Sequence, residues 1–547
     1  MPDLEHMFPT LTAEQMARIA RHARTRTIDA GATLIDAGQQ HDALYIVKEG
    51  ELAVVRPSGT GDDFITKHHA GQFTGEINVL MGRPGFVRIH ATQPSELLEL
   101  DRAALLELIQ TDADLSDVFM RAFLLRRVEL IAQGRGDVVL VGSDHCSDTL
   151  RIREFLSRNG HPYTYIDLDR DEGVQALLDQ FQVTEDEVPV VICRGVTALR
   201  NPTNEQIADC LGFNETIDAT RIRDVVIIGA GPAGLAAAVY AGSEGLDVLV
   251  LESSAPGGQA GASSRIENYL GFPTGISGQE LASRAITQAE KFGAQLMIAK
   301  SARSLACDRK PYAIELENGD RIPARTLIIA TGAQYRKLPI ENGSRLQNAG
   351  IYYGATHIEA QLCRGEEVIV IGGGNSAGQA AVFLADSALR VHVLVRADGL
   401  AESMSRYLVR RIEEHPSIEL HTRCELEMVD GEDHLERVRW RALDGGTTTT
   451  RDIRHVFVMT GAIPATRWLD GCIALDERGF VRTGVDLSRE ELTAMGWPLA
   501  RTPFLLETTL PGVFAIGDVR GGNVKRVASA VGEGAMAVSF VHRTLHE

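Results

Sequence analysis

A glycine-rich turn that follows the apolar run 225–228 has the residue types and spacing of a dinucleotide-binding site. Gly229, Gly231 and Gly234 have the spacing GxGxxG. In a strand–turn–helix unit the first glycine allows a tight turn, the second lets the backbone approach a pyrophosphate, and the third lets the helix pack on the strand. The amide groups at the start of the helix then face the pyrophosphate. The turn therefore predicts a dinucleotide site, which also contains Pro232 and Ala233.

A carboxylate completes this unit. Glu252 ends the apolar run 248–252, where a strand is expected after the helix. An acid at this position can accept hydrogen bonds from the hydroxyls of a ribose. The strand, turn, helix and strand-end acid together predict a nucleotide-binding βαβ unit.

A second turn of the same kind follows the apolar run 368–371. Gly372, Gly374 and Ala377 occupy its three small positions, and Arg396 follows its second strand in place of an acid. An arginine suits the 2′-phosphate of NADPH, whereas an acid suits the free 2′-hydroxyl of NADH. We therefore expect NADPH, with NADH as the alternative. The other residues of this turn are Asn375 and Ser376.

The cysteines point to a different kind of chemistry. There are seven, at positions 146, 193, 210, 307, 363, 424 and 472, and none forms a CxxC pair. This scatter predicts no disulfide framework and a reducing, cytoplasmic location. Cys146 precedes a predicted helix, whose N-terminus favours the thiolate form.

Composition limits the function classes. The chain has 547 residues, 44% of them hydrophobic, and a formal net charge of −19. Such an acidic chain repels nucleic acid. The longest apolar run, 225–242, contains Gly-Pro-Ala-Gly and is predicted as a strand–turn–helix, not as a membrane span. No secretory signal is visible at the N-terminus.

The elements that must position these residues fall into three blocks, which predict a multidomain α/β protein. Residues 1–133 show short β-like runs and a long final helix, as in a β jelly roll. Residues 137–214 alternate strands and helices and are too few for a dinucleotide fold, but they suit a thioredoxin-like one. The third block, 220–547, carries both glycine-rich turns and predicts two Rossmann-like subdomains.

The third block resembles the thioredoxin reductase family of pyridine nucleotide-disulfide flavoproteins. The resemblance rests on GAGPAG with Glu252, on GGGNSA, and on the stretches 257–259, 267–273, 330–332, 512–518 and 526–528. It implies FAD bound by residues 220–335 and 463–547, a nicotinamide cofactor bound by the inserted residues 336–462, and a homodimer. It implies further cofactor-binding residues at Gly258, Gln259, Asn268, Ala330, Thr331, Gly332, Gly517, Asp518, Arg526, Val527 and Ala528.

One departure from this family affects the expected chemistry. Where the family has its redox-active Cys-Ala-Thr-Cys, this chain has Gly354-Ala-Thr-His357. Reduction of a disulfide needs one thiolate to attack and a second to resolve the mixed disulfide, so the usual dithiol route is excluded here. His357 is a candidate catalytic residue, because imidazole can donate a proton near neutral pH. The alternative is that it fills space. Cys363 stands alone and is expected to be a small buried residue.

The first block resembles the cyclic nucleotide-binding domain family. Gly75, Glu76 and Ile77 match the first part of the phosphate-binding cassette, with Glu76 on the ribose and the two neighbouring amides on the cyclic phosphate. The family's arginine is replaced by Gly85, and Arg88 is the candidate to compensate for it. The alternative is a degenerate jelly roll used for docking or dimerisation.

The second block resembles glutaredoxins. Cys146 stands where that family places its redox motif, and Val188-Pro189 matches a Val-Pro pair that is usually cis. A lone thiol can carry one sulfur but has no adjacent resolving partner. Cys146 is therefore a second candidate catalytic residue, and a vestigial site is the alternative.

These observations predict a cytoplasmic flavoprotein oxidoreductase that passes hydride from NAD(P)H to FAD and on to an unknown acceptor. Two alternatives stay open. One is a sensor of redox state or cyclic nucleotide with little turnover, and the other is a disulfide reductase that works through Cys146. No metal site, nucleic acid or membrane partner is expected.

Overall fold

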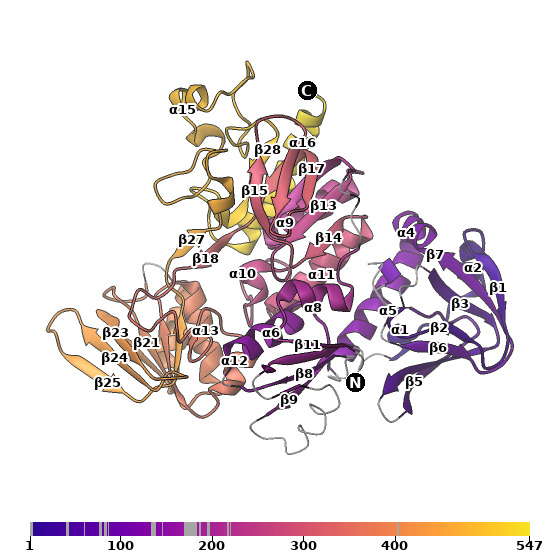
Figure 1. The fold of residues 1–547 in the computed structure, drawn as a ribbon, viewed down its shortest axis with the longest axis horizontal. Helices are drawn as coiled ribbons and strands as arrows, with labels where there is room; N and C mark the ends of the chain where they lie inside the picture. The colour runs from indigo at the N-terminus through magenta and orange to yellow at the C-terminus, as the bar shows by residue number, and fades with distance from the viewer. Residues whose placement is uncertain are drawn as a thin grey trace.

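The computed structural model describes most of the chain (Figure 1). The described residues are 4–39, 43–58, 61–75, 79–80, 85, 87–132, 138–144, 146–168, 183–184, 187–193, 197–215, 218, 220–401 and 404–547. Two residues of the predicted phosphate-binding cassette, Glu76 and Ile77, lie outside them.

The N-terminal part consists of two antiparallel sheets that enclose an apolar core. Alternate residues of β6 are buried, which is the pattern of a strand with one face on a core. The first sheet has the order β1 (Arg24–Ile28), β7 (Ser95–Asp101), β3 (Ala43–Glu49), and the second β2 (Thr33–Ile35), β6 (Arg88–Ala91), β4 (Glu51–Ser58), β5 (Gly61–His69). The helices are α1 (Leu4–Met7), α2 (Ala13–Ile19), α4 (Arg102–Thr111) and α5 (Ala113–Ala132).

The middle segment, residues 138–215, is built on one mixed sheet. β8 pairs in parallel with β9 and antiparallel with β10, and the Val188–Pro189 peptide is cis, as the sequence predicted. The sheet order is β11 (Thr197–Arg200), β10 (Val190–Cys193), β8 (Val138–Gly142), β9 (Tyr163–Asp167), and the helices are α6 (Ser147–Arg158) and α8 (Asn204–Leu211).

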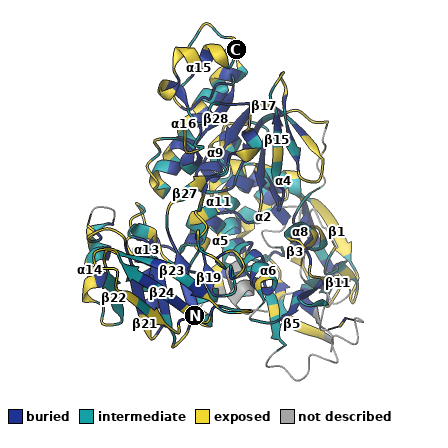
Figure 2. Ribbon diagram, turned by 60° about the vertical axis from the view of Figure 1, so that its left-hand side comes forward, coloured by how far each residue is buried: buried dark blue, intermediate teal, exposed yellow. Residues whose placement is uncertain are grey.

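A larger sheet, which we call the main sheet, carries the first glycine-rich turn. Its parallel strands are nearly continuous apolar runs, because helices and an antiparallel layer cover both faces. The order is β14 (Gln295–Ile298), β13 (Val248–Glu252), β12 (Arg223–Ile228), β17 (Arg321–Ile329), β16 (Tyr312–Leu316), β15 (Ala302–Ala306), and β28 (Val513–Ala515) also pairs with β17. Its helices are α9 (Pro232–Ser243), α10 (Gly258–Gly261), α11 (Gly278–Lys291), α15 (Arg489–Ala494) and α16 (Val527–Leu545). Figure 2 shows buried residues along β17 and β28 and exposed ones on α15.

The second glycine-rich turn belongs to an inserted subdomain with its own parallel sheet. Two short antiparallel strands, β18 (Ala333–Tyr335) and β27 (Ala462–Pro464), join it to the main sheet. The inserted sheet has the order β19 (Ile351–Tyr352), β26 (His455–Val458), β20 (Glu367–Ile371), β21 (Arg390–Leu394), β22 (Ile418–His421). An antiparallel layer of β23 (Cys424–Asp430), β24 (Arg437–Ala442) and β25 (Thr448–Arg451) accompanies it, with helices α12 (His357–Leu362), α13 (Asn375–Ala385) and α14 (Arg406–Glu414).

The middle segment lies between the N-terminal part and the inserted subdomain, below the main sheet in Figure 1. The N-terminal part contacts α11 beside the main sheet through a hydrogen bond, which the Gln110 side chain donates to the Lys291 carbonyl at 3.0 Å. Among the described residues, no helix combines the length and apolar character needed to cross a membrane.

One expectation about the cysteines is wrong. Cys307 and Cys472 form a disulfide, with their Cα atoms 5.9 Å apart. The two residues are 165 positions apart in the sequence, but the fold brings the end of β15 beside the loop that follows β27. The wide spacing of the cysteines along the sequence therefore did not reveal which of them are close in space. The cysteine pattern no longer supports a reducing compartment.

Helices α9 and α16 pack so closely that no side chain fits between them at one point. A Cβ atom on Gly534 would lie 2.5 Å from the Ala233 carbonyl oxygen and 2.9 Å from the Ala237 nitrogen, both in α9. These are backbone atoms, so they can yield only if the helix moves.

We expect Gly534→Ala to lower the free energy of unfolding by about 1–3 kcal/mol, because the added methyl group forces the helices apart. Gly532 is the matched control, since it lies in the same helix and a Cβ there would meet nothing within 4 Å. Gly532→Ala should leave stability unchanged or raise it by up to about 1 kcal/mol. Chemical denaturation followed by circular dichroism measures both, and equal midpoints for the two variants would contradict the packing argument.

Candidate functional site

The first glycine-rich turn is closed on two sides. Gly229 has φ +105°, and a Cβ atom there would lie 2.3 Å from the Ala330 carbonyl oxygen. A Cβ on Gly234 would lie 1.9 Å from the Gly229 carbonyl oxygen. Only glycine fits at either position, so the start of α9 is held directly against the ends of β12 and β17.

The middle glycine of the turn is open. The nearest atom to a Cβ on Gly231 is the Cα of Gly258, at 3.9 Å. Gly257, just before Gly258, has φ +100° and donates its backbone N–H to the Ala230 carbonyl at 2.8 Å. Two stretches of bare backbone therefore face each other beside the N-terminus of α9, an arrangement that can accept a pyrophosphate.

Glu252 organises this turn. Its carboxylate accepts hydrogen bonds from the backbone N–H groups of Ala230 at 2.8 Å and Ser254 at 2.9 Å. The side chain is 8% exposed, and burial raises the pKa of its carboxyl group. Ser253 also makes a side-chain hydrogen bond with this carboxylate, and a remaining lone pair can still accept a hydrogen bond from a ribose hydroxyl.

Two distant stretches reach the same end of the main sheet. A Cβ on Gly517 would lie 2.9 Å from the Cβ of Ala233, so the 517–518 stretch lies against the start of α9. Burial raises the pKa of the Asp518 carboxyl group, and the Lys525 ammonium partly offsets this. Thr331 donates its hydroxyl to the Ala465 carbonyl at 2.9 Å, and Gly332 has φ +66°.

Asn523 follows the 517–518 stretch and carries a side-chain amide that is unpaired within the described part of the chain. Its side-chain amide nitrogen and oxygen are both buried and have no hydrogen-bond partner among the described residues. Buried polar atoms are normally paired, so an unpaired amide is expected to meet a ligand that offers both a donor and an acceptor.

Several cofactor residues predicted from the sequence are more exposed. Gln259 and Asn268 are exposed, as are Arg526 and Ala528, while Val527 is half-buried. Arg526 is the N-cap of α16 and Val527 its first residue. Gln259, Arg526, Val527 and Ala528 therefore lie at or near helix starts, whereas Asn268 lies in the loop between α10 and α11.

The second glycine-rich turn repeats the geometry of the first. A Cβ on Gly372 would lie 2.6 Å from the Met459 carbonyl oxygen and 3.1 Å from the Cβ of Ala377, whereas Gly374 has nothing within 4 Å. The Asn375 side chain accepts a hydrogen bond from the Ser405 backbone N–H at 2.7 Å. This turn also offers open backbone at a helix N-terminus. Arg396 is exposed, two residues beyond the end of β21.

Tyr335 lies between the two turns. Burial raises the pKa of its phenol, a hydrogen bond with Ser376 opposes that shift, and the nearby Asp518 carboxylate adds to it. Ser376 belongs to the second turn, and Asp518 belongs to the region beside the first. The sequence offered no signal for Tyr335, because its role depends on two segments that meet only in the folded chain.

His357 is the first residue of α12, and its ring is exposed. The ring packs edge-on against Phe383 of α13, with centroids 5.1 Å apart. Thr356 caps the helix with Glu359 in a capping box, which fixes the start of α12. Cys363 caps the other end of α12; it is fully buried, and burial raises the pKa of its thiol to about 12. Cys363 is thus a protonated core residue.

Cys146 is the N-cap of α6 and makes no side-chain capping bond. Four residues later, Leu150 packs into the apolar core of the inserted subdomain with Tyr352 and Ala355. The structure therefore brings Cys146 to the side of the middle segment that faces α12, as Figure 1 also shows for α6.

The other end of α6 contacts the loop 254–258, which lies beside the first glycine-rich turn. Arg158 donates to the Gly258 carbonyl at 2.9 Å, and the Asn159 amide approaches the Ser254 carbonyl at 3.5 Å. Asn214 exchanges two hydrogen bonds with the backbone of Ile298, at 2.7 and 2.9 Å. The sequence gave no signal for these contacts, because they join segments that are far apart in the chain.

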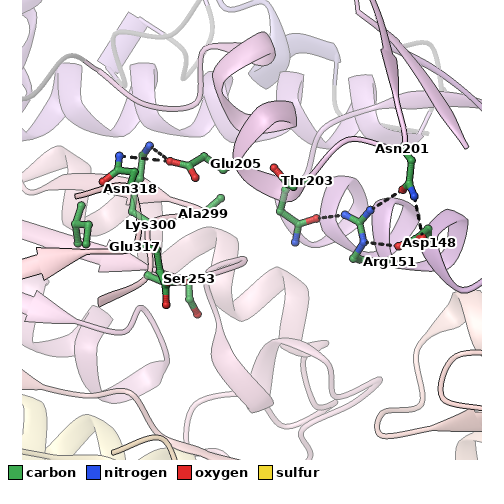
Figure 3. A pocket seen from close by; sticks show the side chains of 13 residues that line it. Asp148, Arg151, Asn201, Thr203, Glu205, Ser253, Ala299, Lys300, Glu317 and Asn318 are labelled. Carbon is green, nitrogen blue, oxygen red and sulfur yellow. Dashed lines mark hydrogen bonds and ion pairs between the residues drawn. The ribbon is translucent and has the colours of Figure 1, made fainter. Parts of the chain in front are cut away.

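A cavity of about 550 Å³ lies between the middle segment and the main sheet (Figure 3). On one side are residues that directly follow β13 and β14, namely Ser253, Ala299 and Lys300. Thr203 and Glu205, at the start of α8, form part of the other side. An ion pair between Lys300 and Glu205 joins the two walls.

The candidate nucleotide site of the N-terminal part is only partly described. Gly75 has φ +90°, and its carbonyl accepts a hydrogen bond from Arg126 of α5 at 2.7 Å. The Arg88 guanidinium pairs with Asp36 at 2.8 Å and Asp62 at 3.0 Å. A phosphate at Arg88 would have to compete with these two carboxylates.

Comparison with known proteins agrees with this arrangement. The model of the pyridine nucleotide-disulphide oxidoreductase family matches residues 223–534, and that of the cyclic nucleotide-binding domain matches residues 25–112. NADPH-dependent thioredoxin reductase 3 of Arabidopsis thaliana is 31% identical over 368 residues, which cover 64% of this chain and 65% of that protein. The thioredoxin reductase of Ureaplasma parvum is 32% identical over 320 residues, 58% of this chain and 96% of its own length.

Solved structures give the same result. The thioredoxin reductase of T. acidophilum superposes with a TM-score of 0.53 at 29% identity and covers 60% of this chain and 100% of its own. That of Lactococcus lactis, in its FR conformation, gives 0.52 at 28% identity, covering 59% and 99%. The predicted jelly-roll domain and thioredoxin reductase-like Rossmann fold are thereby confirmed. The chain belongs to the pyridine nucleotide-disulphide oxidoreductase family, and a cyclic nucleotide-binding domain precedes its oxidoreductase region.

Proposed function

We propose that the chain binds FAD at the first glycine-rich turn and NADPH at the second, and passes reducing equivalents from NADPH through the flavin to an acceptor other than the usual dithiol. The observation that carries the proposal is the pair of open backbone positions, Gly231 and Gly374, each at the N-terminus of a helix. Tyr335 interacts with residues of both regions, which supports a shared reaction space between them.

The residues present fit these cofactors. Bare backbone at Gly231 and Gly258 suits a pyrophosphate, and Glu252 keeps a lone pair for a ribose. The unpaired Asn523 amide suits a ring that both donates and accepts hydrogen bonds. When bound, the flavin supplies the hydride-accepting ring, while the protein binds and orients it. Arg396, free in solvent beyond β21, supports NADPH over NADH.

The direct test is rapid anaerobic mixing of the full chain with NADPH and, separately, with NADH. We expect the flavin absorbance to bleach, and at lower concentrations of NADPH than of NADH. Arg396→Ala should weaken NADPH binding by about tenfold or more, because charge-assisted bonds to the 2′-phosphate are lost. It should leave the response to NADH unchanged. Absence of bleaching with either nucleotide would overturn the proposed function.

The cavity beside the first turn supports a role for the middle segment in holding FAD. In βαβ units the ribose meets the acid at the end of the second strand, and the base extends past the strand ends beyond it. Ser253 and Ala299 directly follow the strands β13 and β14, so the cavity lies where the adenosine end of FAD is expected. Glu205, across the cavity, closes it through its ion pair with Lys300.

Glu205→Ala should therefore raise the rate at which FAD leaves the protein several-fold, because it opens this wall and leaves the Lys300 ammonium, 9% exposed, without its carboxylate. The rate can be followed by the fluorescence of released flavin after dilution. Glu187→Ala is the control, since Glu187 pairs with Arg200 within the middle segment. Equal rates for the three proteins would show that the cavity does not hold the adenosine end.

A second candidate function, disulfide reduction through Cys146, is favoured by one observation. Leu150 packs against the inserted subdomain, so α6 presents its Cys146 end toward the segment 354–357 that replaces the family's redox pair. Apart from Cys210, which is partly exposed, the other cysteines are poorly suited to attack a disulfide. Cys307 and Cys472 are bonded to each other, Cys193 and Cys363 are buried, and burial raises the pKa of the Cys424 thiol.

If Cys146 carries this reaction, Cys146→Ser should abolish NADPH-dependent reduction of an aromatic disulfide reagent while leaving flavin bleaching by NADPH unchanged. The Cys146 thiolate attacks one sulfur and releases the other as a thiolate, which leaves a mixed disulfide on Cys146. Because no second thiol resolves it, two electrons from the reduced flavin would have to split this mixed disulfide into two thiolates, and neither step occurs without Cys146. Cys210→Ser is the control thiol in the same segment. Full disulfide reduction in the Cys146 variant would exclude this route.

A further inference from the structure

Two neighbouring strands of the inserted subdomain bring three metal-ligating side chains together. β21 and β22 are parallel, and their register places His392 beside Glu419 and Leu394 beside His421. Side chains alternate along a strand, so His392, Glu419 and His421 all leave the same face of the sheet. We call these three residues the His392 cluster.

The distances within the His392 cluster suit a small cation. The His392 Nδ1 lies 3.0 Å from the His421 Nε2 and 3.6 Å from one oxygen of Glu419, whose other oxygen lies 3.6 Å from the same His421 nitrogen. Zinc binds nitrogen and oxygen ligands at about 2.0–2.1 Å, which separates neighbouring ligands of a tetrahedron by about 3.3–3.4 Å. With one oxygen of Glu419 taken as the ligand, the three ligand atoms all lie within 4.8 Å of one another, and the carboxylate must turn toward the two nitrogens to complete one face of a zinc tetrahedron.

The surroundings of His392 match those of a metal-bound histidine. The His392 side chain is 1% exposed, and its other ring nitrogen, Nε2, lies 3.3 Å from a carboxylate oxygen of Glu367 on β20. A carboxylate behind a ligating histidine fixes the tautomer and the ring orientation. Trp440 closes one side, with its ring centroid 5.8 Å from that of His392 and 5.6 Å from that of His421.

The remaining side of the cluster is open to solvent. The Glu419 side chain is 46% exposed and that of His421 19%. A water molecule can therefore reach a fourth coordination position. Arg390 also pairs with Glu419, at 3.2 Å, and a bound cation would compete with that guanidinium for the carboxylate.

We propose that the His392 cluster is a zinc-binding site with two histidine ligands, one carboxylate ligand and water in the fourth position. No role in the redox chemistry is needed for this site. β21 leads directly to Arg396, so an ion that ties β21 to the edge strand β22 would stiffen the strand that carries the expected NADPH-selecting residue.

Without a metal ion, the residues of the His392 cluster can form a chain of hydrogen bonds. If Nε2 of His392 donates to Glu367, its Nδ1 can accept from the His421 Nε2. That chain satisfies the same atoms without an ion. The test must therefore measure the metal itself and not only the stability of the cluster.

The experiment uses the full chain without a histidine tag, stripped with a chelator and then titrated with Zn²⁺ in competition with a chromophoric chelator. We expect one zinc ion per chain, a higher melting temperature with zinc, and the visible absorption of tetrahedral Co²⁺ when cobalt replaces it. Glu419→Gln and His421→Ala should each weaken zinc binding at least tenfold. Both residues lie at the solvent side, so these variants are expected to fold.

Two controls address other sources of zinc binding. His415→Gln removes a histidine of the same subdomain outside the cluster, and Cys424→Ser removes its nearest partly exposed thiol. Both should bind zinc like the wild type. Glu367→Gln should weaken binding by about 10–100-fold, as expected for a carboxylate that orients a ligand. Absence of zinc binding by the wild type, or undiminished binding by Glu419→Gln and His421→Ala, would overturn the proposal and leave the hydrogen-bond chain.

Discussion

The fold of the oxidoreductase region depends on one constraint, the direct backbone contact between the start of α9 and its neighbours. Gly234 lies against the Gly229 carbonyl, Gly229 against that of Ala330, and Gly534 of α16 against that of Ala233. Each contact leaves no room for a Cβ atom. Because these contacts join three separate stretches of the chain, at 229–234, at 330 and at 534, the dinucleotide turn exists only when β17 and α16 are in place.

Bare backbone at the turn also determines how the other parts attach. We call the facing backbone of Gly231 and Gly258 the cradle. Arg158 binds the Gly258 carbonyl, and Asn159 approaches that of Ser254, so the middle segment docks on backbone of the loop beside the cradle as well as through the Lys300–Glu205 ion pair. Glu252 holds the same loops from within through two amide groups. The cradle, its carboxylate and the docked segment thus form one hydrogen-bonded unit.

The sequence predicted the features that are set locally. The sequence signals are a glycine at position 229, which the structure gives φ +105°, a strand-end acid at 252 and the short β-like runs of the N-terminal part, and each of them lies within a few residues. The comparisons confirm the corresponding folds. Features that depend on contact between distant segments left no such pattern, and these include the Cys307–Cys472 disulfide, the interaction of Arg158 with Gly258 and the position of Tyr335.

The His392 cluster also could not be predicted from a local sequence pattern, although its residues lie closer together in the chain. His392 and His421 lack the i, i+4 spacing of a helical metal motif, and they meet only because β21 and β22 pair in one particular register. A shift of one residue in either strand would send its side chain to the opposite face. Register is decided by the burial of the whole sheet, so no short window of sequence contains it.

Helix α6 limits how the inserted subdomain can rotate relative to the main sheet. Its C-terminal end is tied to the main sheet through Arg158, while Leu150, two turns earlier, is part of the core of the inserted subdomain. The short strands β18 and β27 also join the inserted subdomain to the main sheet, and the ion pair between Arg411 of α14 and Glu267 adds a further contact. The Cys307–Cys472 disulfide anchors the chain soon after β27. Rotation of the inserted subdomain must therefore break the Leu150 contact or carry α6 away from the cradle. In either case the middle segment opposes the rotation, so the relative orientation of the two nucleotide sites depends on a segment that belongs to neither of them.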